Sequence, residues 1–109
     1  MALSFAALVV AFCNPARSET DGIEDKGHAL IEKNCARCHA TGLSDESPHP
    51  EAPPFRELSL KYPVSYLEEA LVEGLISGHR DMPEFVFSPT EAVAIIRYLR
   101  SIQDRGPAL

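Results

Sequence analysis

The 109-residue chain has no tryptophan, only three cysteines, and fewer basic than acidic side chains. Ten Lys and Arg residues against sixteen Asp and Glu residues give a formal net charge of −6 at pH 7. Because nucleic-acid binding depends on basic side chains that neutralise phosphates, this balance argues against a nucleic-acid partner. Three cysteines are too few for a disulfide framework. The length suits one domain, and no apolar run approaches the roughly 20 residues that cross a bilayer.

An apolar stretch from Ala2 to Phe12 opens the chain. At about eleven residues it is too short to span a bilayer, but it matches the apolar core of a secretory signal peptide, and Ala16 offers a small residue at the cleavage edge. We therefore predict an export signal over residues 1–18 and a periplasmic location. A buried N-terminal helix and a lipidated Cys13 are the alternatives, although the bulky Phe12 disfavours lipidation.

The remaining residues, 19–109, form the predicted domain. Apolar residues recur at helical spacing over about 23–36 and 63–76, and again after Pro89. Gly78 is expected to end the second helix. The segments between them are irregular and rich in proline, glycine and polar residues, and no segment has the pattern of a strand. The fold class predicted from this pattern is all-α.

The last helix has the clearest local start signal in the chain. Ser88 can cap it, Pro89 suits its first position, and Glu91 completes a capping box. Its apolar face consists of Ala92, Ile95, Ile96, Leu99 and Ile102.

The segment Cys35-Ala36-Arg37-Cys38-His39 has the C-x-x-C-H pattern of c-type haem attachment. Two thiols at this spacing can each add to one vinyl group of the porphyrin, which forms two thioether bonds. The imidazole of His39 is then placed to bind the iron. The sequence therefore predicts one covalently bound haem c.

A bare C-x-x-C could also be half of a zinc site or a thioredoxin-like redox pair. A zinc site needs two further ligands, and only His28, His49 and His79 remain, each isolated in the sequence. A redox pair accompanies a βαβ pattern, which this chain lacks. Haem attachment is the favoured interpretation, and we expect His28, His49 and His79 to lie at the surface.

Residues from about 22 to 103 resemble the class I cytochromes c, which are small soluble monohaem electron carriers. The resemblance depends on four features in the family's order: Cys35–His39 after a helix with Gly27 and Ile31, Ala52-Pro53-Pro54-Phe55, Met82-Pro83 before the last helix, and Ile95 with Tyr98-Leu99 within it. The chain departs from the family pattern at three positions. Ala52 replaces a usual glycine, Ile31 stands where an aromatic is common, and Ala40 where glycine is frequent.

The resemblance implies a cytochrome c fold of three to four short helices wrapped around the haem. It implies that Met82 is the sixth iron ligand and that the carbonyl of Pro53 accepts a hydrogen bond from His39, which would orient the imidazole. It also implies that Gly27 lets the first helix lie close to the last one, near Tyr98. The competing interpretations are that Met82 is a core residue and that His79 is the ligand.

In this fold the core largely contacts the haem, and six residues are expected there: Phe55, Leu58, Tyr62, Leu67, Phe85 and Val86. Lys33, Arg37 and Arg80 are expected to form a basic rim around the exposed haem edge.

With both axial positions filled, the predicted function is one-electron transfer rather than enzymatic catalysis. The expected partners are redox proteins, and we expect a monomer without stable membrane insertion once the leader is cleaved. Two alternatives stay open. The protein could be a dedicated cytochrome subunit of a periplasmic dehydrogenase or oxidase, or a haem sensor or peroxidase with an open sixth iron site.

Overall fold

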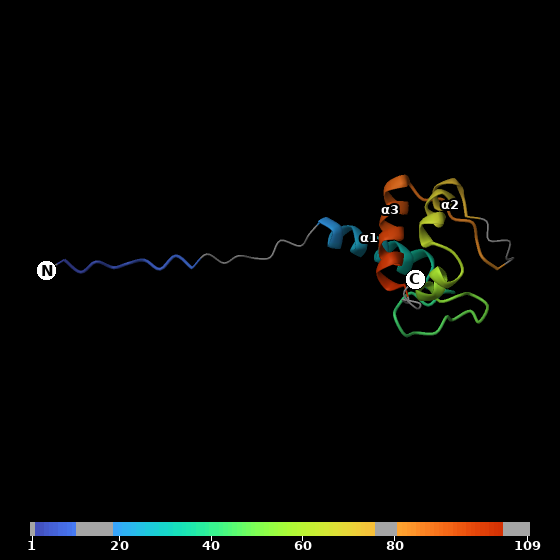
Figure 1. Cartoon of the computed structure of the whole chain (residues 1–109), viewed down its shortest axis with the longest axis horizontal. Coiled ribbons are helices and arrows are strands. Elements are labelled where there is room, and N and C mark those ends of the chain that lie inside the picture. The colour runs from blue at the N-terminus through green and yellow to red at the C-terminus, as the bar shows by residue number, and fades with distance from the viewer. Residues whose placement is uncertain (1, 11–18, 76–80, 104–109) are drawn as a thin grey trace.

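The computed structural model describes residues 2–10, 19–75 and 81–103. These ranges contain no strand, so the all-α prediction is confirmed for them. Figure 1 shows the α-helices grouped around irregular connections. In chain order the elements are α1 (Glu19–Asn34), the 3-10 helices η1 (Phe55–Leu60) and η2 (Val64–Tyr66), α2 (Leu67–Glu73) and α3 (Pro89–Ile102).

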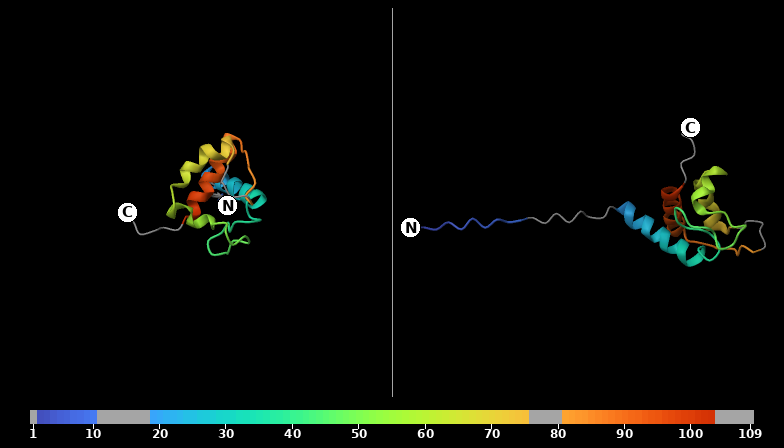
Figure 2. Two further views of the ribbon diagram at one scale, coloured as in Figure 1. Left: turned by 90° about the vertical axis from the view of Figure 1, so that its right-hand side faces the viewer. Right: turned by 90° about the horizontal axis from the view of Figure 1, so that it is seen from below.

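Helices α1 and α3 pack directly on one another at a glycine (Figure 2). Gly27 is buried, and a Cβ atom built on it would overlap the backbone carbonyl of Ala94. One turn further along α1, Ile31 is 0% exposed. Beyond the crossing, the Tyr98 hydroxyl donates a hydrogen bond of 2.6 Å to the carbonyl of Thr41. The close approach of the two helices that was expected at Gly27 is therefore present. It occurs at Ala94, one turn before Tyr98 in α3.

The second predicted helix is shorter than expected and has two parts. It begins as η2, continues as α2 and ends at Glu73, so the prediction that Gly78 ends it is wrong. Gly74 has φ of 116°, a conformation that only glycine adopts at low cost, and its N–H donates to the carbonyl of Ala70 at 2.9 Å. Gly78 itself lies outside the described residues.

The 3-10 helix η1 is an element that the sequence pattern did not predict. Its two buried side chains, Phe55 and Leu58, are three residues apart, which matches the period of a 3-10 helix. Gln103 at the end of α3 fastens it. The amide Nε2 of Gln103 donates to the carbonyl of Phe55 at 2.7 Å, and its Oε1 accepts from the N–H of Ser59 at 2.8 Å.

The start of α3 confirms the predicted capping box. The Glu91 N–H donates to the Ser88 hydroxyl oxygen at 3.2 Å, and the Ser88 N–H donates to the Glu91 carboxylate at 3.0 Å. All five residues of the predicted apolar face are buried in the core.

The segment that leads into α3 corrects one of the core predictions. Val86 is 67% exposed, whereas the neighbouring Phe87 is 8% exposed and belongs to the core cluster. Side chains of neighbouring residues point to opposite faces of an extended backbone, so only one of Val86 and Phe87 can face the core. Tyr62 is 36% exposed and is not part of the core cluster, but it lines the cavity described below.

Residues 2–10 have no helix and lie exposed, away from the rest of the chain (Figure 1). A buried helix, the alternative to a signal peptide, is therefore not found over these residues. Within the ranges that the structure describes, no helix has the length and apolar character needed to span a membrane.

Candidate functional site

A cavity of about 1030 Å³ lies between the end of α1, η1, α2, α3 and the segment around Met82. This volume is at the upper end of the range for ligand pockets, roughly 300–1,000 Å³. The aromatic and larger aliphatic side chains in its wall come from η1, from α2 and the residue that follows Gly74, from the segment after Met82 and from α3: Phe55, Leu58, Leu67, Leu71, Leu75, Phe85, Phe87, Ile95 and Leu99.

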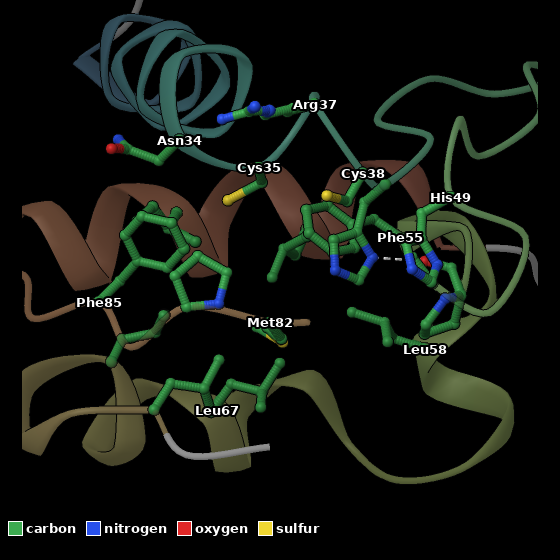
Figure 3. Close-up of a pocket in the computed structure, with 18 of the residues that line it drawn as sticks. Asn34, Cys35, Arg37, Cys38, His49, Phe55, Leu58, Leu67, Met82 and Phe85 are labelled. Carbon is green, nitrogen blue, oxygen red and sulfur yellow. Dashed lines mark hydrogen bonds between the residues drawn. The ribbon is translucent and has the colours of Figure 1, made fainter. Parts of the chain in front are cut away.

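Cys35, Cys38 and His39 line the same cavity. Cys35 continues the last turn of α1, because its N–H donates to the carbonyl of Ile31 at 2.7 Å. The chain then turns tightly, and the N–H groups of Cys38 and His39 both donate to the carbonyl of Cys35, at 3.1 and 3.0 Å. Figure 3 shows the sulfur atoms of Cys35 and Cys38 side by side, both directed into the cavity from one wall.

The environment of Cys35 disfavours its thiolate. Burial raises the pKa of the Cys35 thiol from 9.0 to about 11, and the Glu32 carboxylate adds to the shift. Thiol–disulfide chemistry uses the thiolate, so this position is poorly suited to a redox pair. A zinc site would need a group of at least three ligands, and none formed by His, Cys, Asp or Glu occurs among the described residues.

The imidazole of His39 is fixed by a hydrogen bond that it donates to the loop after the motif. Its Nδ1 lies 2.9 Å from the carbonyl oxygen of Pro53, the contact that the resemblance implies. A carbonyl can only accept, so Nδ1 carries the proton and Nε2 is left with the lone pair. The Phe55 ring stacks on the imidazole at a centroid distance of 4.5 Å. The tautomer with Nε2 unprotonated is the one that can bind a metal through that atom.

Met82 also lines the cavity, on a segment distant in sequence from the cysteine motif. Figure 3 shows its side chain within the cavity, across from the two cysteine sulfurs and near Leu67. Hydrogen bonds to α2 and its end hold the following residues: Leu75 N–H donates to the carbonyl of Phe85 at 3.2 Å, and Phe87 N–H to that of Leu71 at 2.8 Å. His79, the competing ligand, lies outside the described residues.

The other histidines differ from one another. His28 is exposed, as expected, and stacks in parallel on Tyr98 with ring centroids 4.3 Å apart. His49 is partly exposed, with a side-chain exposure of 30%, and it also lines the cavity, which the sequence did not predict. Nothing in the sequence around His49 indicates this position, since it depends on how a proline-rich loop folds back on the cysteine motif.

Of the three residues predicted to form a basic rim, Lys33 and Arg37 lie at the cavity, while Arg80 falls outside the described residues.

A family model described as cytochrome C oxidase, cbb3-type, subunit III matches residues 23–99. The chain belongs to this family of c-type cytochrome domains. Comparisons with curated proteins and with solved structures give no significant match. The matched region of the cytochrome domain contains the cysteine motif, the cavity-lining parts of α2 and Met82, and it begins after the apolar N-terminal stretch.

Membership of this family implies a covalently bound haem c, and the residues of the cytochrome domain fit that cofactor. The cavity is large and mainly apolar, which suits a porphyrin. Its wall presents two adjacent thiols, as two thioether bonds require, and a histidine whose second nitrogen is available. A thioether sulfur, that of Met82, lies in the same cavity. The fold therefore brings together the donor set that the sequence predicts.

Proposed function

We propose that this protein is an exported one-electron carrier with a single haem c attached through Cys35 and Cys38 and ligated by His39 and Met82. The family supplies the coarser conclusion, haem-based electron transfer. The observation that supports the ligand set is the His39–Pro53 hydrogen bond at a cavity that also contains Met82. Bound haem c would supply the one-electron couple between ferrous and ferric iron.

The residues of the cavity would each favour this chemistry. The Pro53 carbonyl keeps the His39 ring in one orientation and one tautomer, and it increases the basicity of Nε2. A thioether ligand such as Met82 raises the reduction potential. The apolar wall disfavours the additional positive charge of ferric iron, which acts in the same direction.

Lys33 and Arg37 would form a basic margin beside the cysteine motif on a protein whose net charge is −6. A local cluster of opposite sign steers a partner towards that edge and increases the association rate more than the affinity. The partners proposed on this basis are redox proteins with an acidic docking surface.

The exported location is supported by the exposed apolar residues 2–10, which precede the domain and lie outside its core. Fractionation of expressing cells and mass spectrometry of the mature protein test it. Recovery of the haem-loaded domain in the periplasm, with its N-terminus near residue 19, is expected. An intact leader on a haem-loaded cytoplasmic protein would overturn the proposal.

A second candidate function, a fixed cytochrome subunit of an oxidase complex, is favoured by the description of the matching family. Affinity purification of the tagged protein at moderate salt separates the two functions. A free carrier elutes alone as a monomer, whereas a subunit co-purifies with membrane-bound oxidase components in fixed stoichiometry.

Absorption spectra of the purified protein test the haem assignment directly. We expect a low-spin c-type spectrum in both oxidation states, retention of the pigment in the polypeptide after acidified organic extraction, and no carbon monoxide binding by the native ferrous protein. Extractable pigment would overturn the covalent attachment. Rapid carbon monoxide binding would instead support the alternative of a sensor or peroxidase with an open sixth site.

A further inference from the structure

His49 forms hydrogen bonds to two sides of the cavity. Its backbone N–H donates to the carbonyl of Cys38 at 3.1 Å, which anchors it to the cysteine motif beside His39. Its ring nitrogen Nε2 lies 3.3 Å from the carboxylate of Asp81, the residue immediately before Met82. One residue therefore connects the wall that carries the cysteines, through its backbone, to the segment that carries the methionine, through its side chain.

The tautomer of His49 follows from a second contact. The backbone N–H of Glu51 donates to Nδ1 of the ring at 3.2 Å, so Nδ1 must carry a lone pair. In the neutral ring the proton then resides on Nε2, and this N–H donates to the Asp81 carboxylate. The anchored backbone and the Glu51 contact together fix the ring so that its donor points at Asp81.

The segment around Met82 is thus held on both sides. After Met82, backbone hydrogen bonds join Phe85 and Phe87 to Leu75 and Leu71. Before Met82, Asp81 is joined to His49. Asp81 is largely exposed, with a side-chain exposure of 64%, whereas the His49 side chain is 30% exposed. The contact therefore holds Asp81, at the surface, against His49, which is better buried in the cavity wall.

We propose that His49 and Asp81 form a clasp that positions Met82 in the cavity. Both are positioning residues, because neither is required to touch the iron. The inference rests on the proposed ligation by Met82. When the clasp is removed, the segment should spend more time with the methionine sulfur withdrawn. A competing small ligand then binds more tightly, because its apparent affinity scales with the fraction of protein in the competent state.

Titration of the ferric haem-loaded protein with imidazole, followed by absorbance, tests the clasp. Loss of a partly exposed, charge-assisted hydrogen bond predicts about five-fold tighter imidazole binding in Asp81→Ala and in His49→Ala. The double variant should bind no more tightly than either single variant, because both remove the same contact. Asp81→Asn keeps an oxygen acceptor for the Nε2 proton but loses the charge, so its imidazole affinity should fall between those of the native protein and Asp81→Ala.

Two further variants make the result specific. Glu84→Ala removes the same charge two residues after Met82, where no contact with His49 exists among the described residues, and should leave imidazole binding unchanged. Met82→Ala should bind imidazole more tightly than any clasp variant. If Met82→Ala binds more tightly but the clasp variants do not, the clasp is wrong and the ligation stands. If Met82→Ala itself has no effect, the proposed ligation fails.

Discussion

Gly27 of α1 lies against the backbone carbonyl of Ala94 in α3, with no space for a side chain between them. This contact sets the separation of the two helices whose packing supports the cavity, because α1 leads directly into Cys35 and α3 contributes Ile95 and Leu99 to the wall. The atom that a substitution would meet is backbone, which cannot rotate away.

Replacement of Gly27 by alanine is therefore expected to destabilise the protein by about 1–3 kcal/mol, the usual cost of overpacking a core. Chemical denaturation of the haem-loaded protein measures the change. Gly22→Ala is the matched control in the same helix, since a Cβ there meets nothing within 4 Å. It should stabilise the helix by about 0.5–1 kcal/mol. Equal effects of the two substitutions would contradict the close contact.

A substitution at Gly74 tests whether helix α2 needs a glycine where it ends. The φ of 116° at this position is unfavourable for any residue with a side chain, so Gly74→Ala should cost about 1–3 kcal/mol in unfolding free energy. The same change should loosen the return of the chain from α2 to the Met82 segment. Thermal unfolding and imidazole binding by the ferric protein report these two effects. A variant as stable as the native protein would show that the helix does not need to end at this glycine.

The raised pKa of Tyr98 predicts that the free energy of unfolding decreases at alkaline pH. Burial raises the pKa of the Tyr98 phenol above 10.0, and the carboxylates of Glu32 and Asp45 add to the shift. The unfolded chain then loses its phenolic proton first, so the contribution of Tyr98 to stability is full below pH 10 and falls as the pH rises through the raised pKa. Denaturation midpoints measured from neutral to strongly alkaline pH should show this loss.

The substitution Tyr98→Phe removes both the titration and the hydrogen bond to the Thr41 carbonyl. We expect a loss of about 1 kcal/mol at neutral pH and a smaller further loss above pH 10. Tyr66→Phe, at a tyrosine that is 72% exposed, should be close to neutral throughout. An alkaline transition that persists unchanged in Tyr98→Phe would assign it to another group.

Met82→Ala tests the sixth ligand. The variant should bind carbon monoxide in the ferrous state, because a coordination position becomes free, and its reduction potential should fall with the loss of the thioether. Val86→Ala is the control, since it lies on the same segment but is largely exposed. Redox titration and carbon monoxide difference spectra provide the two measurements. A variant with the native potential and no carbon monoxide binding would exclude Met82 as a ligand.

Some features of this protein are local in sequence and could be predicted without the fold. The haem attachment motif occupies five consecutive residues, and its chemistry depends on their spacing alone. The capping box at Ser88 is likewise complete within four residues. The all-α class followed from helical periodicity, which an amphipathic face imposes on any sequence that packs it against a core.

Other features depended on packing between distant segments, where the sequence pattern is ambiguous. Helix α2 ends at Glu73, with Gly74 rather than Gly78 as the residue that stops it, and Phe87 rather than Val86 is buried in the core. Both outcomes depend on the hydrogen bonds that join the segment before α3 to α2 and its end. The contact of His49 with Asp81 joins residues that are 32 positions apart. The chemistry of the chain can be predicted from residue type and short spacing, because these specify the groups that form bonds to the cofactor. How those groups are held follows from the fold, because long-range hydrogen bonds and side-chain burial depend on which surfaces meet.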